Sequence, residues 1–373
     1  MNGKRNEGIR SLMKKSVFLV LVFLILLLVI GSLRFLQSTT VTSSAKRLNF
    51  PLAKYVGLDW ISETKLAAFV GDENYGVTGY YLGNDERFYR LELPPFVAKL
   101  DCNEVNDFLT GIHYTQPTLL PDGRLGLINK CISLLEYPGL RRRYMVAYDF
   151  ETKESNLLVN EPLPRASTNG FTWNPNMTLG IAQTYGGLSG TLYWVSPDEI
   201  APVDFAIGDG ERSFVPANIF SGGSSGNDQG IVFSPAWSPD GTTIAFFVTL
   251  DAIGREGFSR SEGEYKIFFM DPVEQKPYSV ADKIYDGEEL AWSPDSKWIV
   301  FIGRYGILGN YGIWLYSIEE EKVYSVTSGR FDEFAWSPDG TAIVATICEP
   351  DHPNILCDRY EIWEYDVSSI TQK

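Results

Sequence analysis

A short phrase that recurs along the chain constrains its fold more than any other feature. Three segments share one order of residues, an Ala-Trp-Ser-Pro-Asp turn followed by an apolar stretch, and they cover 236–246, 291–301 and 335–345. More divergent copies lie upstream. The Trp position of the phrase then falls at six anchors, with a mean interval of about 55 residues: Trp60, Leu119, Trp173, Trp237, Trp292 and Trp336. Self-similarity at this period indicates one supersecondary unit repeated six times.

Each repeat has the same internal order. A short strand ends at the anchor, a Ser-Pro-Asp-Gly turn follows, and a second apolar strand returns. Pro presets φ, Asp bonds the backbone two residues on and Gly accepts a positive φ, so this turn suits a tight reversal. Third and fourth strands follow, as at 312–316 and 323–326. Four antiparallel strands in each of six repeats predict an all-β fold, a six-bladed β-propeller.

These repeats resemble the WD-like repeats of TolB-type β-propellers. The Ala-Trp-Ser-Pro-Asp-Gly phrase carries the resemblance, which covers 57–373. It implies a propeller fold and leaves the activity open. Two departures separate this chain from characterised propellers. We expect a membrane anchor, described below, where TolB has a small α/β domain, and we expect no counterpart of the hydrolase domain that follows the propeller in the dipeptidyl peptidase family. Roles in the Tol system or in peptidolysis are therefore not carried over.

The N-terminus has the pattern of a membrane anchor. Residues 17–30 are fourteen apolar residues without a break, preceded by five basic residues. About 20 residues span a bilayer as a helix, so we expect a transmembrane helix over 16–36. The positive-inside rule then places a stub, 1–15, in the cytoplasm and exports a tether, 37–47, and the propeller, 48–373. A cleaved signal peptide is the alternative.

The charge of the chain narrows the choice of partners. The formal net charge is −15, with +5 in residues 1–45 and −20 in the remainder. Binding to nucleic acid depends on Lys and Arg displacing counterions from phosphates, so a body this acidic excludes nucleic acid as a partner. An anionic lipid surface is an equally poor partner for the body.

The ends of the repeat array predict how the ring closes. The sixth repeat stops after its third strand, near residue 366. An open edge there would invite pairing with another chain. Residues 48–56 have strand character and no other role, so we expect them to supply the missing outer strand.

Long connections are predicted on one face of the disc. They include the connections at 92–116 and 207–230 and, between the second and third strands of three repeats, the loops at about 129–143, 249–264 and 347–359. Binding often resides in such loops; tolerated insertion is the alternative. Four cysteines fall in these regions. An even number in an exported protein favours disulfides, here Cys348 with Cys357 and Cys102 with Cys131. Zinc is the rival use, although the chain has no Cys-x-x-Cys and only two His.

The same face holds the candidate partner-binding residues. Arg and Tyr are favoured at contact hot spots, and the only basic triplet of the acidic body follows a Tyr in one of these loops. A solvated surface is the alternative interpretation. The candidates are Tyr137, Arg141, Arg142, Arg143, Arg255, Arg260, Tyr305 and His352.

The sequence therefore favours a non-enzymatic, membrane-anchored, extracytoplasmic binding or scaffold module for a protein, peptide or envelope polymer. No catalytic residue, cofactor or metal is predicted. The alternative is a propeller-type hydrolase or lyase that acts on glycans or peptides. Carboxylates with raised pKa values distinguish the two. Two or more converging near the channel, with room for a sugar, would count against the binding module.

Overall fold

The computed structural model describes residues 39–40, 43–53, 56–62, 64–71, 77–91, 108–111, 118–133, 141–160, 167–186, 189–203, 207–208, 213–214, 231–249, 264–306, 309–348 and 360–372. The chain divides into two units, Met1–Thr39 and Thr40–Lys373, and the second contains the repeats. No helix in the described ranges is long and apolar enough to cross a membrane. The predicted anchor, 16–36, lies outside those ranges.

Three separate four-stranded antiparallel sheets occur among the described residues. The first contains β3 (Val56–Ser62), β4 (Lys65–Gly71), β5 (Val77–Leu82) and β6 (Phe88–Leu91). The second contains β12 (Ser167–Trp173), β13 (Gly180–Gly186), β14 (Ser189–Val195) and β15 (Ile200–Pro202). The third contains β26 (Phe331–Trp336), β27 (Ala342–Cys348), β28 (Tyr360–Asp366) and β2 (Ala45–Ala53).

The remaining strands form larger and smaller sheets. A five-stranded sheet contains β7 (Phe108–Gly111), β8 (Thr118–Leu119), β9 (Leu125–Ser133), β10 (Arg141–Tyr148) and β11 (Ser155–Leu157). The largest sheet contains β18 (Ile231–Trp237), β19 (Ile244–Thr249), β20 (Glu264–Met270), β21 (Pro277–Tyr285), β22 (Leu290–Trp292), β23 (Trp298–Tyr305), β24 (Tyr311–Ser317) and β25 (Lys322–Ser328). Short elements are β1 (Thr39–Thr40), β16 (Ile207–Gly208), β17 (Ser213–Phe214) and α2 (Ser368–Thr371).

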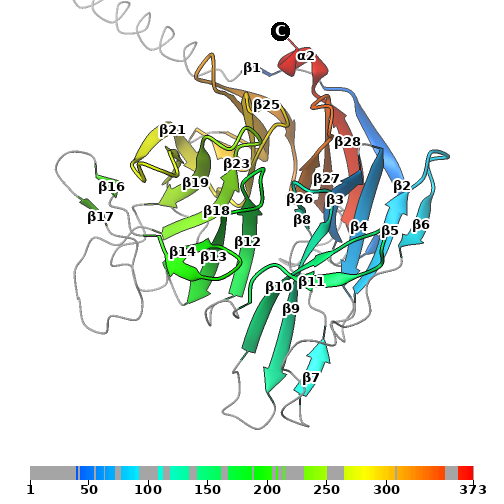
Figure 1. The fold of residues 1–373 in the computed structure, drawn as a ribbon. Helices are drawn as coiled ribbons and strands as arrows, with labels where there is room; N and C mark the ends of the chain where they lie inside the picture. Colours follow the sequence, from blue (N-terminus) through cyan, green and yellow to red (C-terminus); the bar gives the residue numbers. More distant parts are fainter. Residues whose placement is uncertain are drawn as a thin grey trace, which may run out of the picture. The chain divides into compact units, whose positions relative to one another are not determined.

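The sheets make an all-β propeller of four-stranded antiparallel meanders, as the repeats predicted (Figure 1). The prediction of six separate blades is wrong for the described residues. The strands of the fourth and fifth repeats share one sheet, because the end of β21 pairs with the end of β23, Ile284 opposite Tyr305 and Tyr285 opposite Arg304. Register shifts along β21 accompany this, and such bulges bend and twist a strand.

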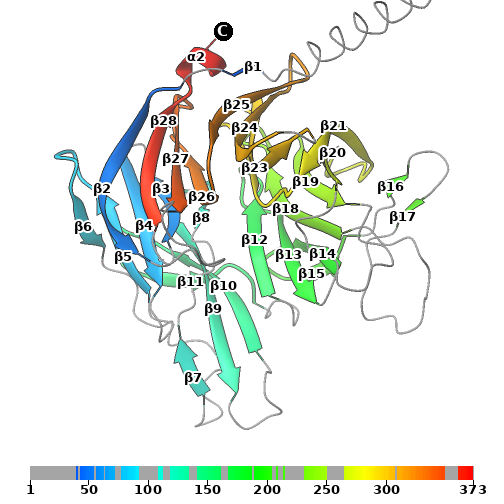
Figure 2. The ribbon, with the colours of Figure 1, turned by 180° about the vertical axis from the view of Figure 1, so that it is seen from behind.

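A strand from the N-terminal side of the repeats completes the last sheet. β2 runs antiparallel to β28, with Lys46 opposite Glu364 and Leu48 opposite Ile362, and Figure 2 shows the two strands side by side. Leu48 and Phe50 are buried, and the Phe50 ring packs edge-on against Phe88 of β6 at 4.7 Å between centroids. The predicted closing strand is confirmed, although it spans 45–53 and not 48–56.

The repeated turn has the hydrogen bonds that its sequence predicts. Ser238 Oγ donates to Asp240 Oδ1 at 2.6 Å and accepts from the Thr243 amide at 2.9 Å, and Asp240 Oδ1 accepts from the Thr242 amide at 3.0 Å. The turns that begin at Ser293 and Ser337 repeat this pattern. The turn aspartates therefore cap turns, and they lie in separate repeats.

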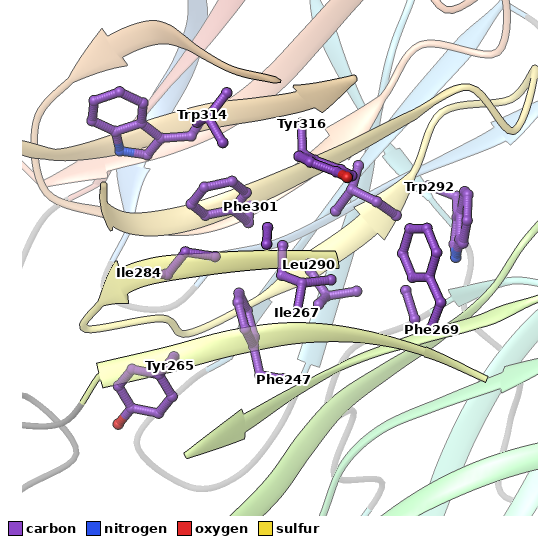
Figure 3. Close-up of a cluster of buried hydrophobic side chains, with 14 of the residues drawn as sticks. Phe247, Tyr265, Ile267, Phe269, Ile284, Leu290, Trp292, Phe301, Trp314 and Tyr316 are labelled. Carbon is purple, nitrogen blue, oxygen red and sulfur yellow. The ribbon is translucent and has the colours of Figure 1, made fainter. Parts of the chain in front are cut away.

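Adjacent repeats pack through aromatic side chains (Figure 3). Trp292, the fifth anchor, lies 5.0 Å from the Phe269 ring, and its Nε1 donates to the Ala236 carbonyl of the preceding repeat at 3.0 Å. Phe301 and Phe247 meet edge to face at 6.3 Å, and both are fully buried. Trp292 thus joins the fifth repeat to the fourth.

Candidate functional site

The inner strands of the repeats surround one cavity, which we call the axial cavity. Its volume is about 320 Å³. Figure 1 shows β3, β8 and β26 close together in the middle of the unit. The residue immediately before every anchor lines the cavity, so each of the six repeats contributes at the same position. These residues are Asp59, Thr118, Thr172, Ala236, Ala291 and Ala335.

The lining differs between the two halves of the repeat array. Before the anchor, the first three repeats have polar residues and the last three have alanine. Three residues before the anchor, the last three repeats have Ser234, Glu289 and Glu333, which also line the cavity. The small alanine side chains leave space in the cavity, and polar side chains from both halves of the repeat array line it. The cavity is thus polar in chemistry although its inner strands are mostly apolar.

Asp59 joins the first repeat to the second. Its Oδ1 accepts from the Trp60 amide at 2.7 Å, and its Oδ2 accepts from the Leu119 amide on β8. The side chain is half-buried because it faces the axial cavity. Burial raises the pKa of Asp59 to about 7, against the opposing effect of these two backbone hydrogen bonds. Asp59 therefore changes its protonation state near neutral pH.

Glu289 is a second carboxylate of the cavity with a raised pKa. Its Oε2 is inaccessible to solvent and has no hydrogen-bond partner among the described residues. Burial raises the pKa of Glu289 well above its ordinary value. Neighbouring carboxylates add to the rise in the order Glu333, Asp332, Glu288 and Asp59. Burial likewise raises the pKa of Glu288, which also lines the cavity.

A chain of hydrogen bonds fixes another part of the lining. Gln183 of β13 is buried, and its Oε1 accepts from the Ser234 amide at 2.8 Å. Ser234 has a positive φ of 51°, which is uncommon outside glycine, and its Oγ accepts from the Leu290 amide at 3.0 Å. Gln183 Nε2 is buried and has no acceptor among the described residues. An amide donor therefore stands unpaired at the cavity.

The described lining of the axial cavity carries four carboxylates, and no Lys, Arg or His is among these residues. Three of them, Asp59, Glu288 and Glu289, have raised pKa values. A volume of about 320 Å³ is at the lower end for small-ligand sites and admits one sugar ring. Carboxyl groups with raised pKa values therefore converge beside space for a sugar, which counts against a non-enzymatic binding module and supports the hydrolase or lyase alternative. They also place the candidate site inside the ring and not on the loops alone.

Most of the predicted partner-binding residues cannot be compared with this site. Tyr137, Arg255, Arg260 and His352 lie outside the described residues. The triplet Arg141–Arg143 begins β10, opposite Ile132, Cys131 and Lys130 of β9, and its side chains are not described. The triplet is therefore part of a strand, and the predicted loop over 129–143 is shorter because pairing continues to Arg141.

Tyr305 is the one candidate whose side chain is described. It ends β23, is half-buried and packs against Trp314 at 5.8 Å between ring centroids. Burial raises its pKa. Tyr305 does not line the axial cavity. Its described contacts are thus those of a packing residue at a strand end.

The cysteine pairings stay predictions. Cys348 ends β27, and it is the one cysteine whose side chain is described. Its predicted partner Cys357 lies outside the described residues. Cys102 does too, and Cys131 is placed in β9 without a described side chain.

The sequence held a signal for the axial cavity that repeat comparison alone did not use. Side chains alternate between the two faces of a strand, so the residues that precede the six anchors are expected on the same face of their inner strands. Three of these six residues are polar. Glu289 and Glu333 also recur at matching positions of consecutive repeats. Buried polar residues at matching repeat positions predict a shared axial site.

Comparison with known proteins bears on the fold. No protein-family model matches the chain. No curated protein matches it either. Similar solved structures include TolB from Acinetobacter baumannii, with 16% identity, a TM-score of 0.47 and coverage of 81% of this chain and 64% of TolB. The chain thus spans somewhat less than two thirds of that protein.

Two enzymes are also similar in structure. An oligogalacturonate lyase in complex with manganese has 12% identity, a TM-score of 0.51 and coverage of 89% of this chain and 96% of the lyase. A puromycin-hydrolyzing peptidase from Mycobacterium tuberculosis has 12% identity, a TM-score of 0.48 and coverage of 90% of this chain and 56% of the peptidase. At such identities the likeness concerns the fold alone. It agrees with the resemblance of the repeats to TolB-type propellers.

The raised pKa values predict an unusual dependence of stability on pH. A carboxyl group whose folded pKa lies above its unfolded value contributes stability below the unfolded pKa, and that contribution is lost as the pH rises through the folded pKa. For Asp59 this window runs from 3.8 to about 7. We expect the free energy of unfolding in urea to fall by about 2–3 kcal/mol between about pH 5 and about pH 8 from this residue alone.

Glu289→Gln provides the comparison for this measurement. It removes a group that acts in the same direction, so the decrease between the two pH values should be smaller than in the wild type. Glu199→Gln, on the surface, should leave the pH dependence unchanged. Stability that is constant or increases over this range in the wild type would contradict the assignment of buried, neutral carboxyl groups to the axial cavity.

Proposed function

We propose that the chain is a membrane-tethered, extracytoplasmic binding module whose ligand site is the axial cavity. The ligand would be a small terminal group of a peptide or an envelope polymer, such as one sugar residue or one side chain. The observation that carries the proposal is the convergence of Asp59, Glu289 and the unpaired Gln183 amide on one cavity. In this proposal residues 16–36 anchor the module, and 37–47 link it to the propeller.

Rigid display explains why such a site suits binding. Asp59 and Ser234 are each fixed by hydrogen bonds between repeats, so little side-chain freedom remains to be lost when a ligand binds. The loop face proposed from Arg141–Arg143 becomes a secondary contact for the rest of the polymer. Binding by loops alone is no longer our preferred interpretation.

Cleavage of a glycan or peptide by a propeller-type hydrolase or lyase is the second candidate. Its support is a pair of carboxyl groups with raised pKa values that line one cavity, Asp59 at about 7 and Glu289 well above its ordinary value. Raised carboxyl pKa values are typical of catalytic acids and bases. Both Asp59 oxygens, however, accept backbone hydrogen bonds, which leaves the carboxylate poorly placed as a nucleophile. Binding therefore ranks first.

An array of short glycans and short peptides tests the proposal with the detergent-solubilised full chain. Three variants accompany the wild type. One alters the cavity, Glu289→Gln with Glu333→Gln; one alters the triplet, with Arg141, Arg142 and Arg143 each changed to Glu; and Glu199→Gln is the surface control. We expect the cavity variant to lose at least about tenfold in affinity for the ligands that the wild type binds. The other two should bind as the wild type does.

The remaining outcomes oppose the proposal. Loss of binding in the triplet variant with retention in the cavity variant would return the site to the loop face. A wild type that binds no member of the array would contradict a peptide- or glycan-binding module. Cleavage products detected by mass spectrometry for the wild type, and absent for the cavity variant, would establish an enzyme in its place. Addition of one water across the cleaved bond identifies a hydrolase, and its absence a lyase.

A further inference from the structure

We infer that the axial cavity recognises a primary ammonium group that has a hydrogen-bond acceptor close by, as in an amino sugar or an aminoacyl group. The inference rests on the proposed function and names the chemistry of its ligand. It depends on the charge of the lining, on one unpaired donor and on the space available.

The charge of the lining selects a cation. Asp59, Glu288, Glu289 and Glu333 face the cavity from β3, from the segment before β22 and from β26. No basic residue is among the described residues that line it. An anionic ligand such as an acidic sugar would meet like charges in a poorly solvated space, which disfavours its binding. An ammonium group would meet several acceptors.

The unpaired side-chain amide of Gln183 is a second observation, and it does not depend on the charge of the lining. Its Oε1 accepts from the Ser234 backbone amide, which fixes the orientation of the side-chain amide and leaves Nε2 as the free donor. A buried donor without an acceptor is costly, so a ligand that supplies a hydroxyl or carbonyl oxygen would stabilise it. A bare metal ion supplies no such acceptor. No group of His, Cys, Asp or Glu suited to a metal ion occurs among the described residues.

The size of the cavity limits the ligand to an end group. About 320 Å³ is enough for a sugar ring or a short aminoacyl group and not for a folded segment. An amino sugar carries an ammonium group next to hydroxyls, and an aminoacyl group carries one next to a carbonyl. Both present the cation and the acceptor on neighbouring atoms.

Binding of an ammonium group should release protons. Several carboxyl groups act together here: Glu333, Asp332, Glu288 and Asp59 all act on Glu289. Burial favours the neutral forms of Glu289, Glu288, Asp332 and Asp59. A cation favours the ionised forms, so affinity should increase as the pH rises. For one group that titrates near 7, the increase between about pH 5 and about pH 6, where the amine of the ligand stays protonated, is about tenfold. A neutral polyol would bind without this dependence.

Titration calorimetry on the full chain tests the inference with four probes. D-glucosamine and L-alaninamide carry the ammonium group, and N-acetyl-D-glucosamine and N-acetyl-L-alaninamide are their neutral counterparts. We expect at least one amine to bind at least about tenfold more tightly than its acetylated counterpart. Its binding enthalpy should depend on the buffer's ionisation enthalpy, as proton release requires. The amine that binds shows whether the ammonium group belongs to an amino sugar or to an aminoacyl group.

Variants separate recognition from folding. Glu289→Gln keeps the shape of the side chain and removes its charge, so we expect it to lose at least about tenfold in affinity for the amine and to unfold no more easily than the wild type. Glu199→Gln should bind the amine as the wild type does.

Equal binding of amine and acetylated probes, or no binding of any probe, would overturn the inference. So would unchanged amine binding in Glu289→Gln. The array experiment tests the proposed function separately. If the cavity variant loses binding to glycans or peptides there while the amine probes fail here, the axial cavity is still the ligand site and its ligand is neutral.

Discussion

Alanine in place of Phe301 is expected to lower the free energy of unfolding by about 3–5 kcal/mol. Phe301 lies on β23 and is fully buried between the fourth and fifth repeats (Figure 3). Its ring meets Phe247 edge to face, and its backbone is paired opposite Trp314 and Leu290. Truncation leaves a cavity that these strands cannot collapse to fill. Urea denaturation followed by tryptophan fluorescence measures the loss.

Tyr278→Ala is the matched control, because it removes an aromatic side chain of the same sheet that is 57% exposed. We expect it to cost about 1 kcal/mol or less. Comparable losses in the two variants would mean that the packing between the fourth and fifth repeats does not stabilise the propeller as described.

Proline at position 48 is expected to open the ring and to produce the second large effect. The Asp366 amide donates to the Ser44 carbonyl, and hydrogen-bonded pairs alternate along an antiparallel ladder. Leu48, opposite Ile362, therefore occupies a hydrogen-bonded position, and proline there removes the donor and a buried side chain. We expect a loss of more than about 3 kcal/mol, above that of Leu48→Ala, and association through the exposed β28 edge.

Arg47→Pro is the control for this variant. Arg47 occupies the alternate position, where the amide of an outer strand faces away from its neighbour and proline is tolerated. The Arg47→Pro variant also loses the ion pair between Arg47 and Glu361, whose charged atoms lie 3.0 Å apart. Because the Arg47 side chain is largely exposed, this pair contributes at most about 1 kcal/mol. Size-exclusion chromatography and denaturation of both variants give the comparison. Equal stability of the two would show that β2 does not close the propeller.

The parts of the fold that depend on local chemistry could be predicted from the sequence. The Ser238 and Asp240 hydrogen bonds need only residues within one turn, so the repeated phrase was enough to place them. The closing strand was predictable too, because the last repeat lacks a strand. Its start at Ala45 was not, since the register of a strand depends on its partner.

The parts that depend on pairing between repeats could not be predicted in this way. The end of β21 pairs with β23 and merges two predicted blades, which no single repeat encodes. The axial cavity depends likewise on six strands meeting. Asp59, Gln183 and Glu289 are far apart in the chain, and their environment follows from burial in the closed ring. A basic triplet in an acidic chain is a stronger local signal than single polar residues in separate strands. It therefore favoured the prediction of a binding site on the loops.

A crystal structure of the full chain grown with D-glucosamine near pH 7 tests the central claim most directly. The account predicts one sugar in the axial cavity, with its ammonium group within hydrogen-bond distance of Glu289 or Asp59 and an oxygen acceptor at Gln183 Nε2. A sugar bound at the loop face, or none bound while the cavity holds only water, would contradict it.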